Sequence, residues 1–201
     1  MNRKIGMCSS IINAAAVACF ALSMPFMFNF GSYLSSIFIA LSFIPMLCAF
    51  CIYADKGRKL AGYTAIAFAA VYAAIILLVY FAQLTTVRLE SLNKQAADIL
   101  DYQNFGLYFN YDLLGYAMMA LATFFAGLSI TPKSTAEKWL KALLMIHGVF
   151  FISCLIMPLL GVFSADMQGA YWIGTALLEF WCIYFIPIGI LSFFYFKKQS
   201  E

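Results

Sequence analysis

The chain has 201 residues, of which 65% are hydrophobic and 10% are charged, and its formal net charge is +3. A soluble domain carries about 25% charged residues, so this composition excludes an ordinary water-soluble fold and predicts a surface that mostly faces lipid. The small net charge gives no reason to expect nucleic acid as a partner. The length suits one compact helical domain over residues 1–201, without a separate soluble domain.

Six apolar stretches are long enough to cross a lipid bilayer, which takes about 20 residues of α-helix. In chain order they cover residues 5–28, 32–53, 60–84, 111–130, 139–162 and 171–196. A polar outer segment, residues 85–110, separates the third stretch from the fourth, and a short loop that contains Asp166 precedes the sixth. The predicted fold class is all-α: a polytopic integral membrane protein with six transmembrane helices.

The basic residues between these stretches fall mostly on one side of the predicted membrane. Ten share that side: Arg3, Lys4, Lys56, Arg58, Lys59, Lys133, Lys138, Lys141, Lys197 and Lys198. Two, Arg88 and Lys94, fall on the other side. Because loops rich in Lys and Arg stay in the cytoplasm, we expect both termini inside the cell. The sequence has no Asn-x-Ser/Thr acceptor, which favours a bacterial source and its inner membrane.

The first stretch has a second interpretation, because two basic residues before an apolar run are also typical of a secretory signal peptide. The stretch Ala16-Val17-Ala18-Cys19 resembles a bacterial lipoprotein cleavage site, although it lacks the usual leucine. The apolar run continues well past that point, to Phe28, so we expect a membrane span rather than a cleaved leader. Cleavage would leave five spans with the same downstream orientation.

The third stretch carries a ridge of small residues at every fourth position: Gly57, Ala61, Ala65, Ala69 and Ala73. Small residues let membrane helices approach closely, so the ridge predicts a packing face for another span or for a second subunit. In the outer segment, apolar residues at helical spacing predict an amphipathic helix that extends the third span or lies on the outer surface. The aromatic residues at 102–112 fit an interfacial belt, the commoner use, or a lid over an outward-facing pocket.

Glu179 is the only acidic residue deep within an apolar stretch. A carboxylate at that depth costs about 2.5–3.5 kcal/mol, so a partner, a water-filled cavity or a bound proton must offset this cost. Thr175 lies one helical turn earlier on the same face. The functional interpretations are a proton carrier or a ligand contact, and the structural alternative is a hydrogen-bonded glutamate that fixes helix packing.

Three further polar residues are candidates. His147, the only histidine, lies in the fifth span at a depth within about 6 Å of Glu179, so either the two make contact or each is satisfied separately. Asn13 is expected to hydrogen-bond across helices from the first span. Asp112 opens the fourth span, where a helix cap is the simpler interpretation and a cation entrance the alternative.

Several chemistries lack their motifs. The sequence has no HExxH, GxSxG or P-loop, and one histidine is too few for a bis-histidine haem site or a multi-histidine metal site. The six cysteines lie in or beside apolar stretches and are expected to pack as small hydrophobes, so we predict no metal and no cofactor.

We therefore predict a small-molecule binding or transport protein in the lipid bilayer. Its expected pocket lies between the fifth and sixth spans, and its ligand-binding residues are Glu179, His147, Thr175, Asn13 and Asp112. The alternative is a non-catalytic accessory, immunity or sensory subunit that acts through a membrane protein partner or a second copy of the chain. An enzyme is the weaker class, because the spans hold few polar groups for catalysis.

Overall fold

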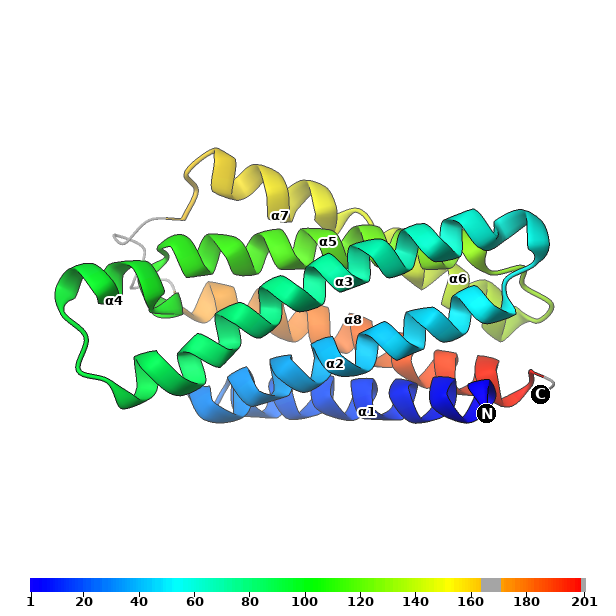
Figure 1. Ribbon diagram of the computed structural model, residues 1–201, viewed down its shortest axis with the longest axis horizontal. Helices are drawn as coiled ribbons and strands as arrows, with labels where there is room; N and C mark the ends of the chain where they lie inside the picture. Colours follow the sequence, from blue (N-terminus) through cyan, green and yellow to red (C-terminus); the bar gives the residue numbers. More distant parts are fainter. Residues whose placement is uncertain (164–170, 200–201) are drawn as a thin grey trace.

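The computed structural model describes residues 1–163 and 171–199, and these form an all-α bundle (Figure 1). The α-helices are α1 (Asn2–Ser23), α2 (Asn29–Tyr53), α3 (Lys59–Ala82), α4 (Lys94–Leu100), α5 (Leu107–Ser129), α6 (Thr135–His147), α7 (Phe150–Leu159) and α8 (Tyr171–Lys197). Three short turns join them: the 3₁₀ helices η1 (Lys56–Arg58) and η3 (Tyr102–Asn104), and the π-helical turn η2 (Gln83–Val87). The predicted loop with Asp166 lies outside the described residues.

Six helical stretches are long and apolar enough to cross a membrane, which confirms the predicted number of spans. They are Asn2–Ser23, Asn29–Tyr53, Lys56–Val87, Leu107–Ser129, Thr135–Leu159 and Gly174–Lys197. The chain is therefore a multi-pass membrane protein. Both termini lie at one end of the bundle and α4 lies at the other (Figure 1), as an even number of spans requires.

α3 packs against both α2 and α5, while α1 packs against α2 and α8. The predicted ridge of small residues is a packing face over part of its length: Ala65, Ala69 and Ala73 are buried, whereas Ala61 is half-buried and Gly57 lies exposed in η1. Gly62 extends the close approach: a Cβ atom there would lie 2.8 Å from the Cys51 Sγ atom of α2. Because the side chains on this face are small, the helix backbones can approach each other closely.

The fifth span is broken rather than continuous. α6 ends at His147, α7 begins at Phe150, and Gly148 between them lies so close to α5 that a Cβ atom would meet Phe124 Cβ at 2.9 Å. α6 packs on both α5 and α8, whereas the main contact of α7 is with α5 (Figure 1). The fifth and sixth spans are thus neighbours chiefly through α6, and α7 has no buried residue.

Basic side chains at the end that carries the termini also stabilise helix ends. The Arg58 Nη1 atom donates to the Leu128 carbonyl at 2.8 Å, and the Lys141 Nζ atom donates to the Ile130 carbonyl at 3.1 Å. Both carbonyls lie at the C-terminal end of α5, where the helix dipole favours positive charge. These two cations therefore satisfy carbonyl groups that the helix itself leaves unpaired.

The outer segment takes both of its predicted forms. α3 continues without a break through the π-helical turn to Val87, and a separate short helix, α4, follows from Lys94 to Leu100. α4 has no buried residue, so it lies on the surface of the bundle at the end opposite the termini. α5 then begins at Leu107, earlier than the predicted residue 111, because Gly106 is its extended N-cap.

Candidate functional site

Asn13 lies within the bundle and makes the predicted contact across helices. Its Nδ2 atom donates to the Ile39 carbonyl at 3.1 Å and to Ser42 Oγ at 3.0 Å, both on α2. Its Oδ1 atom is buried without a partner in the described structure. The amide therefore joins α1 to α2, and this part of its role is structural.

His147 is 1% exposed, and both of its ring nitrogens have partners. Nε2 lies 2.9 Å from Trp181 Nε1, and Nδ1 lies 2.8 Å from Thr123 Oγ1. Because an indole N–H can only donate, Nε2 must accept, and the proton of a neutral imidazole then sits on Nδ1. Thr123 accepts from Nδ1 while its own hydroxyl donates to the Ala120 carbonyl at 2.9 Å. His147 is thus satisfied separately from Glu179, and neither ring nitrogen is left for that contact.

Glu179 is half-buried on α8, in the half of that helix away from the chain terminus. Its Oε1 atom is buried and has no hydrogen-bond partner among the residues that the structure describes. The neighbouring Leu177 and Phe180 side chains are exposed, so this part of α8 borders the bundle surface. Thr175, also half-buried, lies one turn earlier on the same helix. The ligand-binding roles of Glu179 and Thr175 stay predictions.

Asp112 is 2% exposed, which makes it the most deeply buried acidic side chain in the described part of the chain. The helix-cap interpretation is wrong, because Gly106 caps α5 and Asp112 lies in the second turn. Its carboxyl group accepts hydrogen bonds from the hydroxyls of Tyr80 and Tyr102. Its Oδ1 atom nevertheless has no hydrogen-bond partner within residues 1–163 and 171–199.

Four tyrosines that were not among the predicted site residues interact with this carboxyl group, and a fifth, Tyr33, packs on two of them. They come from four elements: Tyr33 of α2, Tyr72 and Tyr80 of α3, Tyr102 of η3 and Tyr116 of α5. We call these five residues, together with Asp112, the Asp112–tyrosine cluster. Helical spacing could have found part of it, because Tyr116 is one turn after Asp112, and Tyr72 and Tyr80 share a face of α3. Pairing between α3 and α5 could not be deduced from spacing.

Two of the tyrosine hydroxyls, like the Asp112 Oδ1 atom, lack a hydrogen-bond partner in the described structure. The hydroxyls of Tyr72 and Tyr116 are buried without a hydrogen-bond partner in the described structure, and both interact electrostatically with Asp112. Their ring centroids lie 6.0 Å apart. A buried polar group without a partner costs about 1–3 kcal/mol, so three of them in one place are a considerable cost to the fold. Such groups in native proteins call for an explanation, and function is a common one.

A second layer of rings closes the cluster toward the outer end. The Tyr33 ring lies 5.4 Å from the Tyr80 ring and 6.2 Å from the Tyr102 ring, measured between centroids. Tyr102 also packs on Phe109, at 5.1 Å. Tyr111, by contrast, is exposed at the outer rim. Within residues 102–112, Tyr102 is half-buried against the cluster and Tyr111 is exposed, and the lid and the interfacial belt both stay predictions.

Gln83 holds this cover in place from the start of the π-helical turn. Its Nε2 atom donates to the Leu100 carbonyl at 2.7 Å, and its Oε1 atom accepts from the Tyr102 N–H at 3.1 Å. Its side chain is buried, so these two hydrogen bonds are protected from water. π-Helical turns are rare and frequently occur at functional sites. Gln83 therefore positions Tyr102 against Asp112.

A pocket of 160 Å³ opens at the end of the bundle that carries α4, next to this cover, and its wall is partly apolar. Its lining includes polar or charged groups from three segments, namely Asn29, Tyr33, Gln83, Arg88, Asp101 and Gln103. Tyr33 lines the pocket and also contacts the rings of Tyr80 and Tyr102, both of which hydrogen-bond Asp112. The pocket and the buried carboxyl group are thus joined through one layer of aromatic side chains.

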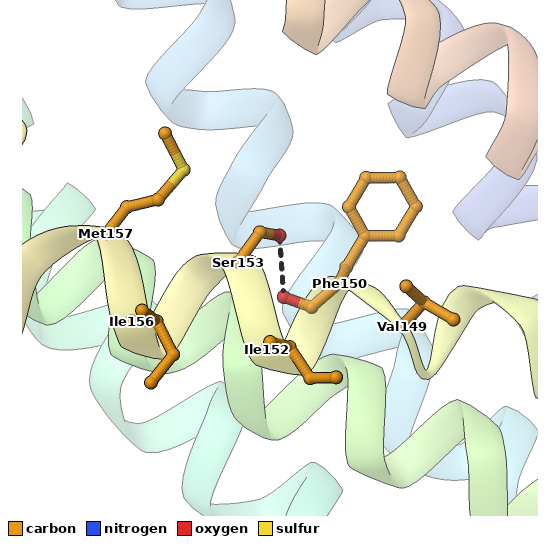
Figure 2. Close-up of a pocket in the computed structure, with 6 residues that line it drawn as sticks. All are labelled: Val149, Phe150, Ile152, Ser153, Ile156 and Met157. Carbon is orange, nitrogen blue, oxygen red and sulfur yellow. Dashed lines mark hydrogen bonds between the residues drawn. The ribbon is translucent and has the colours of Figure 1, made fainter.

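A second hollow, of 350 Å³, follows α7, but it does not resemble a binding site. All of its lining residues come from α7 and the residue before it, and none comes from α8, where the sequence placed the other wall. Figure 2 shows Phe150, Ser153 and Met157 on one side of the helix and Ile152 and Ile156 on the other. The hydroxyl of Ser153 is used within α7, where it donates to the Phe150 carbonyl at 3.0 Å. Binding sites instead combine an apolar wall with converging polar groups.

Comparisons of the chain with protein-family profiles, with characterised proteins and with solved structures give no match.

Proposed function

We propose that this protein is a small-molecule binding or transport protein of the membrane, and that Asp112 is its polar centre. One observation carries the proposal: the buried Asp112 Oδ1 atom and the buried hydroxyls of Tyr72 and Tyr116 all lack partners in the described structure. A ligand that pairs with these groups gains hydrogen bonds without first breaking others. Intramembrane acids that face the interior of a bundle also commonly mark substrate or ion pathways.

The position of the cluster supports the same function. Asp112 lies in the second turn of α5, which is the outer half of that span, and Tyr102 and Gln83 cover it from the outer segment. The 160 Å³ pocket, which Gln83 and Tyr33 line, lies next to this cover. Movement of the short segment that carries Tyr102 would therefore open a route to Asp112 without separating whole spans.

A ligand screen by thermal unfolding tests the proposal on the purified full-length protein. At a ligand concentration of 100 times Kd the native state gains about 2.7 kcal/mol, so a true ligand raises the unfolding temperature measurably. We expect Asp112→Asn to abolish this shift and Asp98→Asn to retain it. Asp98 is a matched control because it is an exposed aspartate in the outer segment. A ligand that stabilises Asp112→Asn as much as the unmodified protein contradicts the proposal.

The same screen tests the prediction for Glu179. If Glu179→Gln loses the ligand-induced shift while it keeps its fold and abundance, Glu179 contributes to the binding site. If the variant only loses stability, the glutamate is structural.

The alternative function, a non-catalytic subunit that acts through contact with another membrane protein, is supported by a different feature, α7. None of its residues is buried, and large apolar side chains such as Ile152 and Leu159 are exposed. The test is co-purification of a membrane protein partner with the unmodified protein and with a variant in which polar residues replace these two side chains. A partner that binds the unmodified protein in fixed stoichiometry and is lost from the variant would favour an accessory subunit. Retention of that protein by the α7 variant would argue against this use of α7.

A further inference from the structure

We infer that the Asp112–tyrosine cluster binds one monovalent cation, either Na⁺ or a proton. This inference rests on the proposed function, because it names the ligand class of the same site.

Asp112 has no basic partner in the described structure. The titratable groups that interact with Asp112 are Tyr72 and Tyr80 (α3), Tyr102 (η3), Tyr116 (α5) and Cys154 (α7). Tyr33 (α2) packs on two of them, Tyr80 and Tyr102. None of them is basic, and no Lys, Arg or His forms an ion pair with Asp112 in the part of the chain that the structure describes. His147 is no counter-ion, since its ring nitrogens bond Trp181 and Thr123. A buried carboxylate without a counter-charge costs several kcal/mol, so a bound positive charge stabilises the cluster.

The surrounding atoms select the kind of cation. The cluster offers oxygen atoms only, from one carboxyl group and several phenol groups. Oxygen atoms suit hard cations, whereas soft metals prefer sulfur and imidazole ligands. A single carboxylate balances a single charge, and the described residues contain no group of three or more acidic, histidine or cysteine side chains that could hold a multivalent ion. These features favour a monovalent ion over a divalent one.

Space limits the size of the ligand. Asp112 lines neither the outer pocket nor the hollow along α7. The rings of Tyr72 and Tyr116 lie within 6.0 Å of each other beside it. Because neither hollow reaches Asp112, this packing excludes an organic molecule and limits the ligand to a single ion or a proton.

The sodium arm of the test measures thermal unfolding of the purified full-length protein at constant ionic strength, while N-methylglucamine chloride is replaced stepwise by NaCl. If Na⁺ is the ligand, we expect the unfolding temperature to rise with Na⁺, with an apparent affinity that Asp112→Asn weakens by about tenfold or more. Asp98→Asn retains the response. Tyr72→Phe, which removes one unpartnered hydroxyl and keeps the ring, serves if Asp112→Asn does not fold. It is expected to weaken the response several-fold.

The proton arm uses infrared difference spectroscopy of the same protein at neutral pH. If a proton is the ligand, the unmodified protein shows the band of a protonated carboxyl group, which disappears in Asp112→Asn and persists in Asp98→Asn. An unprotonated Asp112 together with no response to Na⁺ overturns the inference. If an organic ligand then still stabilises the protein through Asp112, the proposed function stands without the inference. If no ligand does so, both fail.

Discussion

Burial separates the two intramembrane acids of this chain in a way that the sequence could not show. Glu179 lies near the middle of an apolar stretch, and Asp112 lies near the end of another, so depth along the chain favoured Glu179. The helices reverse this order: Asp112 is 2% exposed, whereas the side chains around Glu179 border the surface. Burial depends on the rotation of a helix and on its neighbours, and residue spacing alone determines neither.

For Asn13 and His147, the residue type alone is enough to predict that a hydrogen-bond partner exists. Asn13 was expected to bond across helices, and it does so to α2. His147 was expected either to meet Glu179 or to be satisfied separately, and Trp181 and Thr123 satisfy it. An unpaired polar group in lipid must find some partner, and this physical demand can be read from the residue type. The identity of that partner depends on tertiary packing.

Replacement of Trp181 by phenylalanine tests the histidine contact. The variant keeps an aromatic ring but leaves the buried His147 Nε2 atom without its donor, so we expect a loss of about 1–3 kcal/mol in the free energy of unfolding. The measurement is denaturant-induced unfolding of the purified protein in detergent. Trp172→Phe is the control, because Trp172 is on the same helix and is exposed. Equal losses in both variants would show that the indole N–H contributes nothing specific.

At the level of the helices, the apolar stretches predict the number and the order of the spanning helices. A segment that crosses the bilayer must satisfy all its backbone hydrogen bonds internally, so each long apolar stretch is expected to be a helix. The break after His147 was not predicted, although Gly148 marks it. Glycine is common in membrane helices, so its presence alone does not distinguish a break from a packing contact. Here it makes a close approach to Phe124 of α5.

The cover over Asp112 makes a prediction about the outer segment. Gln83→Leu removes the partners of the Tyr102 N–H and the Leu100 carbonyl, so the segment should open more readily. A loss of about 1–3 kcal/mol in local stability corresponds to faster amide exchange at residues 100–105. Hydrogen–deuterium exchange measures this change. Gln95→Leu, at an exposed position of α4, should leave exchange there unchanged. Unaltered protection in Gln83→Leu would contradict the role of Gln83.

Close packing between α1 and α8 leads to a prediction with a control on the same helix. A Cβ atom at Gly189 would lie 2.8 Å from Ala14 Cβ and 3.2 Å from the Ser10 carbonyl oxygen, whereas nothing lies within 4 Å at Gly174. We expect Gly189→Val to cost about 1–3 kcal/mol through overpacking, and Gly174→Val to cost much less. Thermal unfolding in detergent compares the two. A Gly189→Val protein as stable as Gly174→Val would mean that α1 and α8 do not approach this closely.

For the whole molecule, the termini share one end of the bundle with most of the basic loops (Figure 1). The charge bias predicts that this end is cytoplasmic. Single cysteines at Asn93 and Lys133, in a protein without its six native cysteines, test the prediction in intact cells. A membrane-impermeant thiol reagent should label Asn93→Cys, and it should label Lys133→Cys only after lysis. The opposite pattern would reverse the orientation.

The stability of Asp112→Asn, measured without added ligand, tests the central claim most directly. Asparagine is nearly the same size as aspartate, cannot carry a negative charge, and keeps an oxygen that accepts from the hydroxyls of Tyr80 and Tyr102. If Asp112 is kept for binding rather than for folding, the variant unfolds with a free energy equal to or above that of the unmodified protein. A loss of about 1–3 kcal/mol, of the size expected when a structural buried hydrogen bond is removed, would contradict the account.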